Sequence, residues 1–126
     1  MKNIIAAIFV CLLSAVSYGA SAQAQVEFAE TSHKFGEIVE GGGTVSHVFT
    51  FTNTGDAPLL ITAIQVNCSC TKTTYTRQPV PAGGKGEVKV TYDPKRQSGT
   101  FNKTINVYTN ATEPRSIITV SGSIKQ

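Results

Sequence analysis

Short runs of alternating apolar and polar residues fill most of the chain. In the clearest run, residues 44–53, Val45, His47, Phe49 and Phe51 occupy alternate positions, so an extended chain places them on one face. The same alternation recurs in three later runs, with apolar residues at Val88, Val90 and Tyr92, at Phe101, Ile105 and Val107, and at Ile118, Val120 and Ile124. After the first residues, no run has helical spacing. The pattern therefore predicts β-strands.

Turn-forming residues separate these runs at intervals of roughly 8–14 residues, which is typical of a two-sheet β-sandwich. The segment Asn53–Pro58 has side chains that cap turns, and we expect it to join its flanking strands as an antiparallel pair. The next run, Leu59–Val66, is apolar almost throughout, which is typical of a buried central strand. We predict an all-β sandwich of seven or eight strands.

The N-terminus has the pattern of a cleavable secretory signal. Lys2 precedes an apolar run from Ile4 to Val16, and Ala20-Ser21-Ala22 supplies small residues for cleavage. The run is shorter than the ~20 residues that span a bilayer, although an uncleaved anchor is the alternative. We predict a signal peptide over residues 1–22, with a second possible cut after Ala24, and a single domain over 23–126.

Removal of the signal would make the protein periplasmic or secreted, with no membrane span. Cys11 would leave with the signal, so Cys68 and Cys70 would be the only cysteines of the mature chain. Exported proteins meet oxidising conditions, in which disulfides form.

Charge and motifs exclude several classes of function. The formal net charge is +3, and it falls to +2 (3 − 1) without Lys2. The positive side chains are scattered along the sequence, so we expect no nucleic-acid binding. Hydrolase and metalloprotease motifs are missing, and the chain has two histidines. We therefore predict no enzymatic activity and no cofactor.

Cys68 and Cys70 have the most reactive side chains of the predicted mature protein, and three roles are open to them. They could be structural, either as small apolar side chains or as a disulfide that bends the chain at Ser69. A strained bond of this kind would suit thiol–disulfide exchange. Two thiolates could also bind copper or zinc, with His47 as a third ligand if the Asn53–Pro58 pairing brings it to the same end. We expect His33 to face solvent.

Four motifs resemble a bacterial secreted family, domain of unknown function 1573. They are Phe49-x-Phe51-x-Asn53-Thr54-Gly55, Pro58-Leu59-x-Ile61, Cys68-x-Cys70-Thr71, and Gly99-x-Phe101 with Val120-x-Gly122. Members commonly have Gly where this chain has Ser69, which weakens the case for a strained loop at that point. The family is similar to immunoglobulin-like domains related to major sperm protein. The resemblance implies an immunoglobulin-like sandwich in the cell envelope, and it implies no reaction.

Our leading hypothesis is a non-enzymatic binding or assembly module of the cell envelope. Its exposed sheet edges would suit strand addition by a protein partner. The alternative is a thiol–disulfide redox protein or a copper- or zinc-binding protein that uses Cys68 and Cys70.

Overall fold

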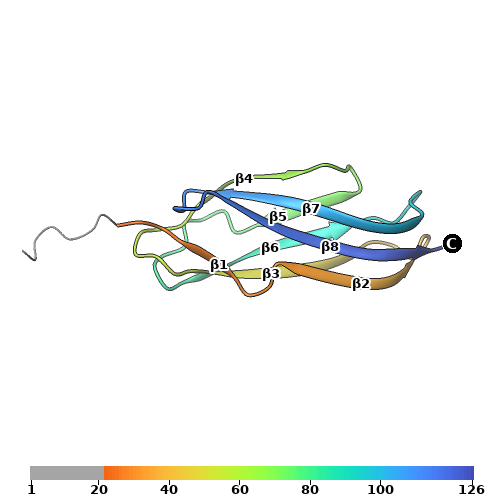
Figure 1. The fold of residues 1–126 in the computed structure, drawn as a ribbon, viewed down its shortest axis with the longest axis horizontal. Helices are drawn as coiled ribbons and strands as arrows, with labels where there is room; N and C mark the ends of the chain where they lie inside the picture. Colours follow the sequence, from red (N-terminus) through yellow and green to blue (C-terminus); the bar gives the residue numbers. More distant parts are fainter. Residues whose placement is uncertain (1–21) are drawn as a thin grey trace, which may run out of the picture.

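Eight strands form two four-stranded sheets that pack face to face (Figure 1). The computed structural model describes residues 22–126, so the predicted signal peptide lies outside the described residues except for Ala22. The strands are β1 (Val26–Phe28), β2 (Ser32–Val39), β3 (Val45–Asn53), β4 (Ile61–Val66), β5 (Thr71–Tyr75), β6 (Lys85–Tyr92), β7 (Gly99–Thr109) and β8 (Arg115–Lys125). This confirms the predicted all-β sandwich. Within residues 22–126 there is no helix long and apolar enough to span a membrane.

The chain passes between the two sheets at several points, and two of these crossings contain candidate site residues. Sheet A has the order β1-β3-β6-β5, and sheet B has the order β2-β8-β7-β4. The segment Ala29–Thr31 leads from β1 in sheet A to β2 in sheet B, and we call it the first crossing. The segment Asn67–Cys70 leads from β4 in sheet B to β5 in sheet A, and we call it the second crossing.

The predicted pairing of the strands on either side of Asn53–Pro58 is wrong. Strand β3 pairs with β1 and β6, whereas β4 lies in the other sheet and pairs with β7. The Asn53 side chain explains the difference. Its Nδ2 donates hydrogen bonds to the carbonyl oxygens of Ala57 (2.7 Å) and Val80 (2.9 Å), and its Oδ1 accepts from the amides of Gly55 (2.9 Å) and Gln25 (3.3 Å). These bonds hold a wider connection that carries the chain to the opposite sheet.

The apolar faces that the sequence predicts do meet in the core. Phe49 and Phe51 from sheet A pack with Ile105, Val107 and other residues of sheet B in the larger of two buried clusters. The alternation of buried and exposed residues along β3, β6 and β8 confirms the predicted strand faces. Ala24 also belongs to this cluster, so the folded unit includes residues just before β1.

A second, smaller cluster fills the end of the sandwich where β6 ends. It contains Tyr92, whose ring stacks on Phe101 with 4.0 Å between the centroids and 8° between the planes. Cys70 is buried in this cluster, and Cys68 packs against it. The side of the sandwich that carries the two cysteines is therefore apolar inside.

Strand β4 is an edge strand of sheet B, so the predicted central position of Leu59–Val66 is wrong. A register shift between Ile61 and Ala63 explains its misleading composition. The shift turns Ile61 and Ile64 toward the interior although they are three residues apart, while Leu59 makes a separate bridge to Val80. The run is thus apolar because the strand bulges and not because both of its faces are covered.

Candidate functional site

The second crossing contains both cysteines, and they are joined as a disulfide. Their Cα atoms are 5.1 Å apart, closer than the ~6.5–7 Å of alternate residues in an extended strand. The Thr71 amide donates to the Cys68 carbonyl (3.1 Å), which closes a four-residue turn around Ser69. Arg96 is the one non-glycine residue of the described range with positive φ, so Ser69 makes this turn without glycine's freedom.

The surroundings of the two sulfurs differ. Cys70 is 7% exposed, and Cys68 is only partly buried. Beside Cys70 a pocket of about 320 Å³ is lined by Ser69, Cys70, Asp93, Lys95, Arg96 and Gln97. Two basic residues and one acidic residue therefore line the space beside Cys70.

The second crossing also exposes part of strand β7. Val66, the last residue of β4, lies opposite Ile105, so β7 from Gly99 to Lys103 has no strand of sheet B beside it on that side. The Thr109 amide bonds to Pro114 on the β8 side, and the Asn110 amide bonds to Leu60 on the β4 side. Backbone groups of successive residues alternate in direction along a strand.

Odd-numbered residues of β7 therefore bond to β8, and the N–H and C=O groups of Thr100 and Asn102 point to the open side. A groove of about 180 Å³ lies at this point, lined by Val66, Asn67, Cys68, Thr71, Asn102, Lys103 and Thr104. We call this feature the β7 groove. It combines unpaired strand backbone with one of the two cysteines.

The first crossing brings together three residues that could bind a metal. His33 of β2 and His47 of β3 stack their rings, with centroids 3.7 Å apart and 8° between the planes. His47 Nε2 contacts the carboxylate of Glu30, and one ligand atom from each of the three residues lies within 4.8 Å of the others. We call this set the Glu30–His33–His47 cluster.

His33 is half-buried against the ring of His47, so it is less exposed to solvent than we expected. Burial lowers the pKa of its imidazole, and the nearby His47 lowers it further, while Glu30 opposes both effects. The sequence contains the alternation that turns His33 and Phe35 to one side of β2, but a polar break before β2 concealed it.

His47 does not lie with the cysteines. Its strand, β3, is separated from β5 by β6, so two strand spacings, about 10 Å, lie between His47 and the strand that follows Cys70. Its ring is directed to His33 and Glu30 instead. The placement of His47 beside the cysteines depended on the β3–β4 pairing, which the fold does not contain.

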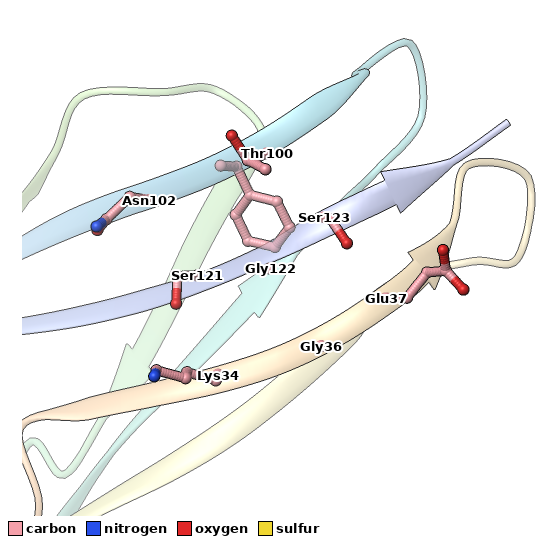
Figure 2. Close-up of a pocket in the computed structure, with 9 residues that line it drawn as sticks. Lys34, Gly36, Glu37, Thr100, Asn102, Ser121, Gly122 and Ser123 are labelled. Carbon is pink, nitrogen blue, oxygen red and sulfur yellow. The ribbon is translucent and has the colours of Figure 1, made fainter.

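A shallow hollow of about 590 Å³ lies on the outer surface of sheet B. Lys34, Ser121 and Asn102 form a row across β2, β8 and β7, and Gly36 and Gly122 leave the space beside them without side chains (Figure 2). Strand β2 bulges between Lys34 and Glu37, and Gly36 has φ of 75°. Apart from Phe101, the lining residues are glycines and polar or charged side chains, and none of their hydroxyl groups is hydrogen-bonded to a base.

Comparisons with known proteins agree with this fold. The model of a family described as "Protein of unknown function (DUF1573)" matches residues 26–124. No curated protein sequence matches the chain. A protein of unknown function from Porphyromonas gingivalis W83 superimposes with a TM-score of 0.72 and 18% identity, covering 86% of this chain and 50% of that one. This chain thus spans half the length of that protein.

Two further solved structures are similar. PapD-like domain 7 of human CEP192 has a TM-score of 0.63 at 14% identity, with 88% of this chain and 93% of that domain covered. WR4, a major-sperm-protein (MSP) family member of C. elegans, has a TM-score of 0.50 at 11% identity, with 83% and 100% covered. At these identities the likeness establishes the fold alone.

Proposed function

The chain belongs to the DUF1573 family of proteins of unknown function, and from that premise we propose that it is a non-enzymatic binding module of the cell envelope. It accepts an extended segment of a partner protein along the open edge of β7. The observation that carries this proposal is the β7 groove, where unpaired backbone of β7 meets a ready-made depression. The location in the envelope rests on the predicted signal peptide.

The other sheet edges are less suited to strand addition. Strand β2 has Lys34 and Glu37 on either side of its bulge, and charges and bulges both protect an edge. Strand β1 has three residues, and β5 carries Lys72. The uncovered part of β3 lies beside the Glu30–His33–His47 cluster.

A bound segment would extend the position that β4 occupies in sheet B. Its backbone would pair with the N–H and C=O groups of Thr100 and Asn102, which supply affinity that does not depend on the partner's sequence. The side chains of Val66 and Lys103 line the same groove, one apolar and one positive. We expect the partner segment to combine apolar residues with a nearby carboxylate.

Asn102→Pro tests this proposal, because proline removes the Asn102 amide, one of the two that face the open edge, and leaves the β7–β8 ladder intact. Cells that express the full chain with a photo-crosslinking amino acid at Lys103 should yield one discrete protein adduct. We expect Asn102→Pro to reduce the yield of the adduct about tenfold. The partner would lose one hydrogen bond to β7, and its carbonyl group would be desolvated without a donor. Immunoblotting of the envelope fraction measures the adduct.

Val48→Pro is the matched control. The last hydrogen bond on the β1 side of β3 runs from the Ala29 amide to the Thr50 carbonyl, and the amide of Val48 faces the open edge beyond it. This variant should leave the adduct unchanged. An adduct that persists in Asn102→Pro, or that forms equally from a crosslinker at Lys89 on the outer face of sheet A, would refute the β7 groove as the binding site.

A second candidate function is thiol–disulfide exchange at Cys68 and Cys70, favoured by the basic side chains beside Cys70. An external thiolate would attack the more exposed Cys68 sulfur, break the S–S bond and release the Cys70 thiolate. A second external thiolate would then attack the mixed disulfide on Cys68. It would leave joined to the first external thiol as a disulfide, with both cysteines reduced. Lys95 and Arg96 would stabilise the leaving thiolate. Binding of copper or zinc by the same residues would require the reduced form, and His47 lies too far away to assist.

We expect Lys95→Gln/Arg96→Gln to slow the reduction of the disulfide by dithiothreitol about threefold, because the leaving thiolate loses its neighbouring charges. Stopped-flow kinetics at low ionic strength measures the rate. Lys85→Gln/Lys89→Gln removes the same charge from β6 and should have no effect. Equal rates in all three proteins would exclude an electrostatic contribution and with it this second candidate.

A further inference from the structure

We propose that Glu30, His33 and His47 form a binding site for a divalent transition-metal ion of the zinc class. Each residue comes from a different segment: Glu30 from the first crossing, His33 from β2 in sheet B, and His47 from β3 in sheet A. Two imidazole nitrogens and a carboxylate oxygen are a ligand set that zinc, copper(II) and cobalt(II) accept. This site is independent of both the β7 groove and the cysteines.

The packing around the two rings holds them at the edge between the sheets. The ring of Phe35 meets His33 edge-on at 4.8 Å between centroids, and Phe49 meets His47 in the same way at 4.8 Å. These phenylalanines form an apolar floor beneath the imidazoles. An apolar surround lowers the local dielectric and strengthens the attraction between a cation and its ligands.

The opposite side of the cluster is open to solvent. The side chain of His47 is 23% exposed and that of Glu30 is 48% exposed. An ion could therefore enter directly, and water could occupy its remaining coordination positions. Three protein ligands and an open position describe a site that zinc fills readily.

The movement that an ion would require is small. Ligand atoms around tetrahedral zinc are about 3.3 Å apart, since each bond is about 2.0 Å long. The three atoms already lie within 4.8 Å of one another. A rotation of one imidazole out of the parallel stack, together with a shift of the exposed Glu30 side chain, would close the difference.

A bound ion would connect the two sheets at this edge. Strands β2 and β3 belong to different sheets and share no backbone ladder, so contacts between side chains join them here. An ion that binds the folded chain and not the unfolded one stabilises the fold in proportion to its occupancy. We therefore expect metal binding to raise the unfolding temperature.

The test uses untagged protein purified from cells that express the full chain, stripped with a chelator. Addition of Zn(II) at about 100 μM should raise the unfolding midpoint by about 5 °C. Co(II) should give visible absorption bands, which report coordination at temperatures well below unfolding. His33→Ala and His47→Ala should each weaken Co(II) binding at least about tenfold. Loss of a residue that only hydrogen-bonds to a metal ligand already lowers metal affinity by that factor, and loss of a ligand should cost more.

Two variants serve as controls. Glu27→Gln removes a carboxylate of β1 outside the cluster, and Cys68→Ser/Cys70→Ser removes both thiols. Both should bind Co(II) as the unaltered protein does. The proposal is overturned if neither histidine variant weakens binding, if the cysteine variant abolishes it, or if Zn(II), Cu(II) and Co(II) all leave the unaltered protein unchanged. Because the readout is spectroscopic, a lower stability of a histidine variant does not obscure the result.

Discussion

Replacing Asn53 with alanine should lower the free energy of unfolding by about 3 kcal/mol. Asn53 is fully buried, and its side-chain amide uses both donors and its acceptor oxygen on backbone groups. Alanine would remove the donor to the Ala57 carbonyl and the acceptor of the Gly55 and Gln25 amides, and a buried polar group without a partner costs about 1–3 kcal/mol. Urea unfolding measures the loss as a lower midpoint with an unchanged slope.

Asn110 provides a matched control. It too bonds the backbone on both sides of a turn, accepting from the Leu60 amide (2.8 Å) and donating to the Pro58 carbonyl (3.1 Å), but in an exposed position. Water can replace these bonds, so Asn110→Ala should cost about 1 kcal/mol. If the two substitutions cost the same, burial would not be the source of the Asn53 effect.

Substitution of Gly122 by alanine should cost about 2 kcal/mol through overpacking. A Cβ atom there would lie 2.7 Å from the Gly36 carbonyl oxygen and 2.9 Å from two ring carbons of Phe101. The Phe101 ring is stacked on buried Tyr92 and has little room to move. Figure 2 shows Gly36 and Gly122 on the neighbouring strands β2 and β8.

Gly41→Ala is the corresponding control, because a Cβ atom at Gly41 would have no neighbour within 4 Å and its φ is not positive. Its effect on the free energy of unfolding should stay within about 0.5 kcal/mol. Calorimetry of the two variants separates the effect of crowding from that of losing a glycine. Equal stability of Gly122→Ala and the unaltered protein would show that β2 can shift away from β8.

The strands and their buried faces could be predicted from sequence because one side chain in two points to the core. This simple rule places Phe49 and Phe51 in sheet A, and Ile118 and Val120 in sheet B, within the core. The sheet to which each strand belongs could not be predicted in this way, because turn residues report only on the local direction of the chain. The segment Asn53–Pro58 has the composition of a hairpin turn, but the hydrogen bond from Asn53 to Val80 depends on a residue 27 positions later.

One of the two candidate side-chain sites could be anticipated from the sequence, and the other could not. A Cys68–Cys70 bond, one of the alternatives that the sequence leaves open, requires a bent chain, and the turn at Ser69 has that bend. The Glu30–His33–His47 cluster could not be found from spacing. Its residues meet because the chain leaves sheet A after β1 and enters sheet B as β2, and the sequence contains no local signal for that change of sheet.

The parallel pairing of β2 with β8 has a consequence for the order in which the chain folds. Ser32 pairs with Thr119, a separation of 87 residues (119 − 32). Strand β8 lies between β2 and β7, so a central strand of sheet B is the last of the eight to be synthesised. Until it arrives, β2 has no strand to pair with, and loop closure over this distance is slow. We therefore expect sheet B to form only after β8 is available, and the sandwich to fold on the millisecond-to-second scale of other sandwiches rich in long-range contacts.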